Sequence, residues 1–136
     1  LDLQKGHFKE TIIMASLLEK EVRSYKDKQI VAGILWKRMK EGWPLQVDST
    51  INYALGESGV KTHFSDLEFN SPYNTYKYKG LPPGPICNPG FSAIVAALNP
   101  TDTNYYYFLT DPSNLKNTVY SVTFDEHVAN KAKYGL

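Results

Sequence analysis

The sequence predicts a single α+β domain in which helices predominate. Three observations support this prediction. Apolar residues recur with helical spacing in the first third of the chain, two β-rich stretches flank a turn near the end, and a long segment rich in proline and tyrosine lies between them. The 136 residues fit one domain, and 42% hydrophobic with 21% charged residues is ordinary for a globular protein. No internal repeat or low-complexity linker suggests a second domain.

Two helices are expected in the first third of the chain. The first covers about residues 8–22, and its residues 12–18 are apolar on nearly all sides, which is typical of a buried helix. The second begins at Ser24, where Ser24 and Asp27 fit a capping box in its aspartate variant. Its core-facing side is predicted to carry Ile30, Val31, Ile34, Leu35 and Met39, and the glycine and proline of residues 42–44 end it.

The middle of the chain predicts two short helices followed by an irregular segment. The helices are expected at residues 49–55 and near residues 65–68. Residues 70–90 then carry five of the eight prolines. A structureless stretch longer than roughly 12–15 residues is usually functional or disordered, and the many aromatic residues here favour an ordered, functional loop.

The last third predicts a helix, a β-hairpin and a final helix. Residues 92–98 form the first of these helices, which Pro100 closes. The stretches "NYYYFLT" and "NTVYSVT", on either side of "DPSN", predict the hairpin. Thr123 and Glu126 form a T-x-x-E capping box for the final helix.

Composition and motifs exclude several functional classes. A net charge of +1 argues against a nucleic-acid binder. No apolar run reaches the roughly 18 residues that a membrane span needs, and there is no signal peptide. Cys87 is the only cysteine, so no internal disulfide is possible, and we expect a buried or incidental thiol. The three histidines have no metal-ligand spacing, no metal site is expected, and no phosphate-binding or hydrolase-elbow motif occurs.

Two glutamates near the end of the first helix point to possible acid chemistry. With Ile12 set at zero and about 100° per residue, the bulky apolar stripe spans about 100° to 280°. Glu21 falls near 180°, in the middle of that stripe, whereas Glu19 falls near 340°, on the side of the small residues. A carboxyl group among Leu and Met side chains is poorly solvated, so its pKa rises, as a general acid near neutral pH requires.

Each candidate residue also has an ordinary structural explanation. The helix could end at Glu21 and leave that side chain in solvent, and Glu19 could pair with a lysine or line a groove on the other side. Asp48 could cap the short helix through the next two residues, which is its commoner role, or contact substrate. The tyrosines of the irregular segment could be packed in the core or could line a sugar-binding cleft, since aromatic rings stack on sugar faces; these are Tyr73, Tyr76 and Tyr78.

Four linked stretches of sequence resemble a known family. "MASLLEKE", "LQVDSTINYALG", "SPYNTYKYKGLPPGPICNPG" and "ALNPTDTNYYYF" follow in this order. Together they resemble the catalytic domain of the YceG-like (MltG) family of endolytic murein transglycosylases, over roughly residues 11–134. Four motifs in order are far more specific than any one of them.

The resemblance implies a lysozyme-like fold and a set of site residues. The family's catalytic acid is the second glutamate of its E-K-E motif, which is Glu21 here. A looser similarity to the goose-lysozyme-related transglycosylases implies that Gln46 and the pair Tyr73–Asn74 line the cleft near Glu21. Asp48, Tyr76 and Glu19 are the further candidate substrate-binding residues, and the sequence leaves open whether Glu19 assists Glu21 or only supports the fold.

The resemblance also implies a reaction that needs one acid and no cofactor. Protonated Glu21 would cleave the glycosidic bond between N-acetylmuramic acid and N-acetylglucosamine in peptidoglycan. The same carboxylate would then help the muramoyl 6-hydroxyl to form a 1,6-anhydro end. The expected ligands are glycan strands, the candidate protein partners are peptidoglycan synthases, and the chain is expected to be a monomer.

Full-length members of the family are expected to carry a membrane anchor and a LysM-like region before this domain. Because the chain begins at Leu1 instead of a methionine, we expect it to be a piece of a longer protein that lacks both. The intact parent would be held at the outer face of the bacterial cytoplasmic membrane, within the cell envelope.

Three other functions would each account for part of the sequence. A non-catalytic peptidoglycan-binding module would keep the aromatic cleft but would not need an inward-facing acid. A lysozyme-type hydrolase would share the substrate but would have to position a water molecule and usually a second carboxylate. An aminodeoxychorismate lyase would need pyridoxal phosphate and a phosphate cup, for which no glycine-rich turn stands out.

Overall fold

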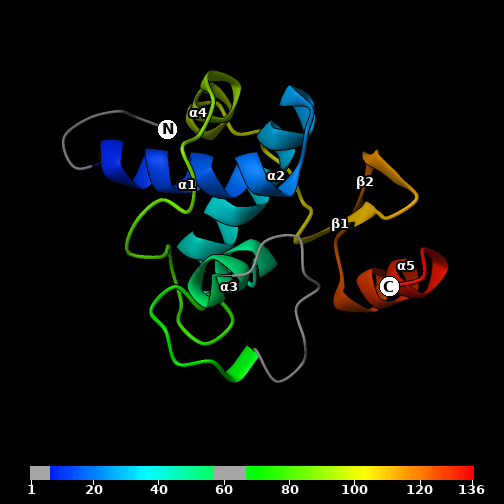
Figure 1. Cartoon of the computed structure of the whole chain (residues 1–136). Helices are drawn as coiled ribbons and strands as arrows, with labels where there is room; N and C mark the ends of the chain where they lie inside the picture. Colours follow the sequence, from blue (N-terminus) through cyan, green and yellow to red (C-terminus); the bar gives the residue numbers. More distant parts are fainter. Residues whose placement is uncertain (1–6, 57–66) are drawn as a thin grey trace.

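The computed structural model describes residues 7–56 and 67–136, which form helices and one small antiparallel sheet (Figure 1). This confirms the prediction of a helix-dominated α+β domain with a hairpin and a long loop. The elements of the described residues are α1 (His7–Glu21), α2 (Tyr25–Lys40), α3 (Asp48–Leu55), α4 (Phe91–Leu98), β1 (Tyr107–Asp111), β2 (Asn114–Ser121) and α5 (Phe124–Lys133).

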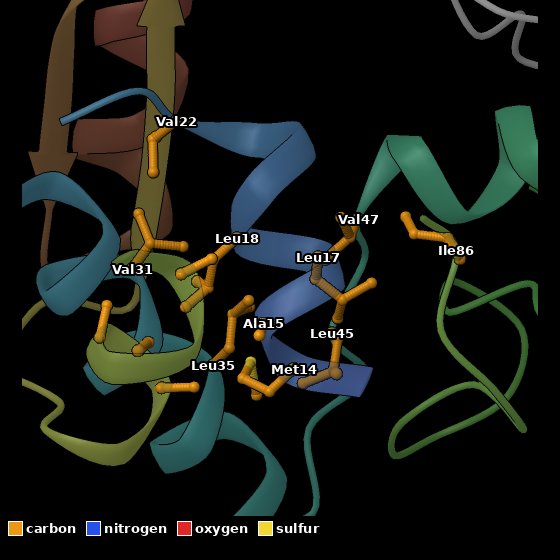
Figure 2. Packing of buried hydrophobic residues seen from close by; sticks show 14 residues of the cluster. Met14, Ala15, Leu17, Leu18, Val22, Val31, Leu35, Leu45, Val47 and Ile86 are labelled. Atoms are coloured by element: carbon orange, nitrogen blue, oxygen red, sulfur yellow. The ribbon is translucent and has the colours of Figure 1, made fainter. Parts of the chain in front are cut away.

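Helix α1 lies at the centre of the hydrophobic core. It packs against α2, α3 and α4, and Figure 1 shows it between α4 and α3. The side chains of Leu17 and Leu18 are completely buried. In Figure 2, Leu18 lies toward Val31 of α2, whereas Leu17 lies beside Leu45 and Val47 in the segment that leads into α3. The near-continuous apolarity of residues 12–18 therefore reflects a helix that is enclosed on several sides.

The start of α2 confirms the predicted N-cap at Ser24 but only half of the capping box. The Ser24 hydroxyl accepts a hydrogen bond from the Asp27 amide at 3.0 Å. The Asp27 carboxylate does not return to the Ser24 backbone; it accepts hydrogen bonds from the Ser24 hydroxyl at 2.9 Å and from the Tyr120 hydroxyl at 2.5 Å. The first turn of α2 is therefore joined to strand β2.

The segment after α4 runs very close to the middle of α2. A Cβ atom on Gly33 would lie 1.9 Å from the Thr101 carbonyl oxygen. The Thr101 amide donates to the Gln29 carbonyl at 3.0 Å, and the Lys37 ammonium donates to the Thr103 carbonyl at 2.6 Å. The glycine inside α2 thus permits a contact that any larger residue would block.

The proline- and tyrosine-rich segment is ordered by its own hydrogen bonds and by contact with α1. The buried Asn74 amide group bonds four backbone groups of its own loop. Further along, the Ile86 amide donates to the Ser16 hydroxyl of α1 at 3.1 Å. The expectation of an ordered loop over residues 70–90 is therefore confirmed.

The hairpin and α5 match the predicted order with shifted strand ends. Strand β2 begins at Asn114, three residues before the predicted stretch, and a register irregularity lies between Thr110 and Asp111. The complete Thr123–Glu126 capping box at the start of α5 confirms that prediction. Helix α5 packs mainly on the two strands and has no buried side chain.

Two further sequence predictions concern the short helix near residues 65–68 and the lack of a membrane-spanning helix. The helix expected near residues 65–68 lies partly outside the described residues, and only Leu67 and Glu68 are seen, in a 3₁₀ turn. Within the described ranges, no helix has both the length and the apolar character needed to cross a membrane.

Candidate active site

A cleft of about 610 Å³ gathers residues from nearly every part of the described chain. One group of lining residues comes from the end of α1, from α2, from the 45–48 segment and from the tyrosine-rich loop; we call its members Glu21, Gln46, Asp48 and Tyr76 the acidic wall. A second group comes from β1 and α5; we call its α5 members Phe124, His127 and Lys131 the α5 wall.

Glu21 occupies the last position of α1 and lines this cleft. The helix does end at this residue, yet the carboxyl group does not escape into solvent. Burial, and secondarily the negative charge of Asp48, raise the pKa of Glu21 to about 7, against the opposing influence of Ser49 at the start of α3. The Ser49 hydroxyl lies near the carboxyl group, although it completes no hydrogen bond of normal geometry among the described residues.

This arrangement predicts that Glu21→Gln becomes more stabilising as pH rises. Folded wild-type protein holds the Glu21 proton up to about pH 7, whereas the unfolded chain releases it near the ordinary value of 4.5. The unfolded state therefore binds fewer protons between these values, and the free energy of unfolding of wild type falls with pH. At 1.36 kcal/mol per pKa unit, the difference between variant and wild type should widen by about 3 kcal/mol from pH 4 to pH 8. Urea unfolding of both proteins at several pH values measures it, and a constant difference would contradict it.

The segment before α3 contains a strained residue, Gln46, and hydrogen bonds with buried threonines hold it in place. Gln46 adopts a left-handed φ of 54°, which is uncommon for a non-glycine residue. Its amide donates to the Thr75 carbonyl at 3.2 Å, and the next amide, of Val47, donates to the Thr75 hydroxyl at 2.9 Å. The Thr50 hydroxyl completes this buried group by donating to the Val47 carbonyl at 2.7 Å. The strain at Gln46 is thereby held in place, as is common at functional sites.

Asp48 and Tyr76 form a pair within the acidic wall. The Tyr76 hydroxyl donates a hydrogen bond to the Asp48 carboxylate. Burial first, and then the charge and hydrogen bond of Asp48, raise the pKa of Tyr76, so the phenol stays protonated. The capping role considered for Asp48 is wrong: it is the first residue of α3, and Val47 occupies the N-cap without a side-chain bond. Asp48 is instead a second carboxylate in the cleft.

Three of the candidate cleft residues lie elsewhere. Asn74 is completely buried, and its amide group is fully used in closing its own loop. The Tyr73 ring packs against the hydrophobic core and against Tyr53, with ring centroids 5.0 Å apart. The core explanation therefore holds for Tyr73. Tyr78 is 43% exposed and donates to the Asn70 side chain at 2.5 Å, outside the cleft lining.

Glu19 also lies outside the cleft and has a structural contact. Its carboxylate accepts a hydrogen bond of 2.8 Å from the amide of Gly90, the N-cap residue of α4. A carboxylate at the amino end of a helix is stabilising, because the amide groups there lack partners within the helix. The helical-wheel separation of Glu21 from Glu19 thus corresponds to two different environments.

Arg38, which the sequence analysis did not single out, lines the cleft from α2 with only 6% exposure. Its guanidinium donates to the carbonyls of Tyr106, Pro44 and Leu45 at 2.8, 3.1 and 3.2 Å. These bonds join α2 to the 45–48 segment and to the start of the hairpin. The pattern of α2 marks this position only as one basic residue among several in its last turn.

The described residues that line the cleft offer acid, base and hydrogen-bonding groups. Over residues 7–56 and 67–136, no cluster of three or more histidine, cysteine or acidic side chains could hold a metal ion. The chemistry that the lining residues themselves offer is proton transfer by Glu21, hydrogen bonding by Tyr76 and Asp48, and contact with aromatic rings.

Comparisons with known proteins agree on one family. The profile described as the YceG-like family matches residues 1–133. An endolytic murein transglycosylase of Bacillus subtilis (strain 168) is 43% identical over 123 residues, which cover 90% of this chain and 34% of that protein. Another, of Streptococcus pneumoniae serotype 2, is 34% identical over 130 residues, which cover 92% of this chain and 23% of that protein. The chain therefore spans only a minor part of these relatives.

A solved structure shows the same fold. The crystal structure of a YceG-like protein from Listeria monocytogenes superposes with a TM-score of 0.88 and 42% sequence identity. The match covers 94% of this chain and 41% of that chain.

Proposed function

The chain belongs to the YceG-like family, and from this membership and the environment of Glu21 we propose that it is a lytic transglycosylase acting on peptidoglycan. Two relatives named endolytic murein transglycosylases support the substrate and the reaction class. The substrate lies in the cell envelope, so we expect the chain to act there, alongside the enzymes that polymerise the glycan.

The observation that carries this proposal is the partly buried carboxyl of Glu21 in a cleft, with its raised pKa. A pKa of about 7 keeps a large fraction of Glu21 protonated at neutral pH, which suits a general acid. Two opposing influences act on the same group: burial and Asp48 favour the neutral form, whereas Ser49 favours the charged form. Both protonation states are therefore accessible, and a residue that acts first as acid and then as base needs both.

The proposed reaction uses Glu21 twice. Protonated Glu21 donates its proton to the glycosidic oxygen between N-acetylmuramic acid and N-acetylglucosamine, and the bond breaks through an oxocarbenium-like state. The Glu21 carboxylate then accepts the proton of the muramoyl 6-hydroxyl as that oxygen bonds the anomeric carbon. The products are a free N-acetylglucosamine end and a 1,6-anhydro-muramoyl end, without consumption of water.

One observation favours a lysozyme-type hydrolase as the second candidate. Asp48 supplies a second carboxylate in the same cleft, and paired carboxylates are usual in glycoside hydrolysis. Its hydrogen bond from Tyr76 and its effect on Glu21 fit a supporting electrostatic role better than a free nucleophile. We therefore rank the transglycosylase first.

Product analysis tests the proposal and separates the two candidates. Purified peptidoglycan is digested with the wild-type chain, and the products are read by mass spectrometry before and after borohydride reduction. Anhydro-muramoyl ends, which borohydride does not change, are the expected result. Reducing muramoyl ends would identify a hydrolase instead. Binding of glycan strands without any cleavage would favour a non-catalytic binding module.

Replacing Asp48 should move the pH dependence of cleavage toward acid. The Asp48 charge raises the pKa of Glu21, so Asp48→Asn should lower that pKa and shift the alkaline limb of the activity profile to lower pH. Activity near pH 5, where Glu21 stays largely protonated, should remain within about tenfold of wild type. Initial rates measured from pH 4.5 to 9 check this. A complete loss at every pH would point to Asp48 as a hydrolytic nucleophile.

A further inference from the structure

The α5 wall carries a positively charged side chain, Lys131, into the same cleft that the carboxyl groups of the acidic wall line. Phe124, His127 and Lys131 are spaced three and four residues apart, so they share one face of α5. All three line the cleft, as does the last residue of the chain, Leu136. Figure 1 shows α5 beside the hairpin. The face of α5 that meets the cleft therefore ends in an ammonium group.

The buried guanidinium of Arg38 adds a second positive charge to this region. Its donors reach backbone carbonyls, and no carboxylate among the described residues pairs with it. The guanidinium also lies over the Tyr107 ring, 4.9 Å from the centroid, and the same ring stacks on His127 at 5.0 Å. A buried charge without an ionic partner keeps an outward field, because neutral carbonyls solvate it without cancelling it.

The charges of Lys131 and Arg38 both act on the imidazole of His127. Burial first, and then the charges of Lys131 and Arg38, lower the pKa of His127. The imidazole is therefore mainly neutral at pH 7. Its Nδ1 atom is buried without a hydrogen-bond partner among the described residues. Lys131 is the exposed cation of the α5 wall and has the freedom to meet a ligand.

From this placement we propose that Lys131 binds a carboxylate carried by the glycan strand, and that Arg38 supports the same site through its field. This inference rests on the proposed function, since peptidoglycan supplies the strand. Its sugars are neutral at their rings, so its carboxylates come from the stem peptides or, where the peptide is absent, from the lactyl group of muramic acid. The carboxylates of the acidic wall would repel the same group. A strand would therefore bind in one orientation, with its side substituents toward α5 and its glycosidic bond toward Glu21.

Lys133 offers a matched control on the same helix. It has the same charge and the same helix turn, but it lies outside the cleft lining, with its ammonium 5.6 Å from the centroid of Tyr134. Both lysines interact similarly with the end of α5, so Lys131→Gln and Lys133→Gln should cost similar stability. Any difference between them in ligand binding then reports on the cleft.

Binding is measured with the Glu21→Gln chain, so that no strand is cut. The ligands are intact uncrosslinked strands, strands stripped of stem peptides by an amidase, and neutral chitooligosaccharides. Lys131→Gln should weaken binding of intact strands about fivefold at low salt, with less effect at high salt, while Lys133→Gln changes it less than twofold. An effect of Lys131→Gln on intact strands assigns the stem-peptide carboxylates, because the lactyl carboxyl group is bound there in a neutral amide. An effect on stripped strands alone would assign the lactyl carboxylate, which the amidase sets free.

Two results would overturn the inference. One is equal binding by the Lys131 and Lys133 variants to both carboxylate-bearing strands. The other is an equal Lys131 effect on chitooligosaccharides, which carry no carboxylate. Since binding is read without cleavage, a chain that cuts no peptidoglycan but binds strands through Lys131 would refute the proposed reaction and leave this inference standing.

Discussion

Glu21→Gln should lower the rate of peptidoglycan cleavage by at least about a thousandfold. Positioned acid–base catalysis typically contributes 10² to 10⁴ in rate, and here one carboxyl group would serve both proton transfers. Glutamine keeps the size of the side chain and its hydrogen-bonding capacity, but it can neither donate a catalytic proton nor accept one. Because the substitution also removes a partly buried acid whose ionisation is unfavourable in the fold, the variant should remain folded, so lost activity would not be due to lost structure.

Release of soluble fragments from purified peptidoglycan measures this effect under conditions where wild type is linear with time. Glu19→Gln is the matched control: it lies two residues away on the same helix, and its side chain contacts the Gly90 amide, outside the cleft. Its activity should stay within about threefold of wild type. Comparable fragment release by wild type and Glu21→Gln would remove Glu21 from the catalytic role.

Gly33→Ala should destabilise the fold by about 3 kcal/mol, although helix propensity alone predicts the opposite sign. In an exposed helix interior, alanine is favoured over glycine by about 1 kcal/mol. Here the added methyl group would lie 1.9 Å from the Thr101 carbonyl oxygen. This distance is far shorter than any non-bonded contact between two heavy atoms. That oxygen belongs to the backbone, and its segment is tied to α2 by the Gln29 and Lys37 contacts. Relief of the clash therefore requires the backbone to move, at a cost typical of overpacking.

Chemical denaturation of Gly33→Ala and of Gly42→Ala separates this clash from the general effect of replacing a glycine. Gly42 has a left-handed φ of 77° but open space around its Cβ position, so its replacement should cost only about 1 kcal/mol. If Gly33→Ala is as stable as wild type or more so, the close approach of α2 and the Thr101 segment does not exist in solution.

The sequence predicted the location of Glu21 because that prediction depends only on local periodicity. Successive residues of a helix point in known directions, so an acid within an apolar stripe must either meet the core or end the helix. Both are true of Glu21. The N-caps at Ser24 and Thr123 were predictable for the same reason, since a cap involves residues three apart along the chain.

The remaining cleft residues depend on contacts between distant segments. Tyr73, Asn74 and Tyr76 are close neighbours in one loop, and the sequence does not indicate the hydrogen-bond partners of their polar groups. Only the folded structure shows that Tyr76 is the one that lines the cleft. Tyr76 does so by bonding Asp48, 28 residues earlier. Arg38 could not be identified, because its three carbonyl partners come from two segments that no sequence pattern brings together.

The weak anchoring of α5 has a consequence for how the cleft behaves on slow timescales. No residue of α5 is fully buried, and the helix packs on a two-stranded sheet, so few contacts resist its detachment. Regions of this kind open in sub-global units at lower free energy than global unfolding. In native-state hydrogen exchange, the amides of α5 and of the exposed strand β2 should therefore exchange together and well before those of α1. A bound glycan strand would slow the exchange of these amides. Binding of substrate would therefore be visible as protection of α5, which lines one side of the cleft.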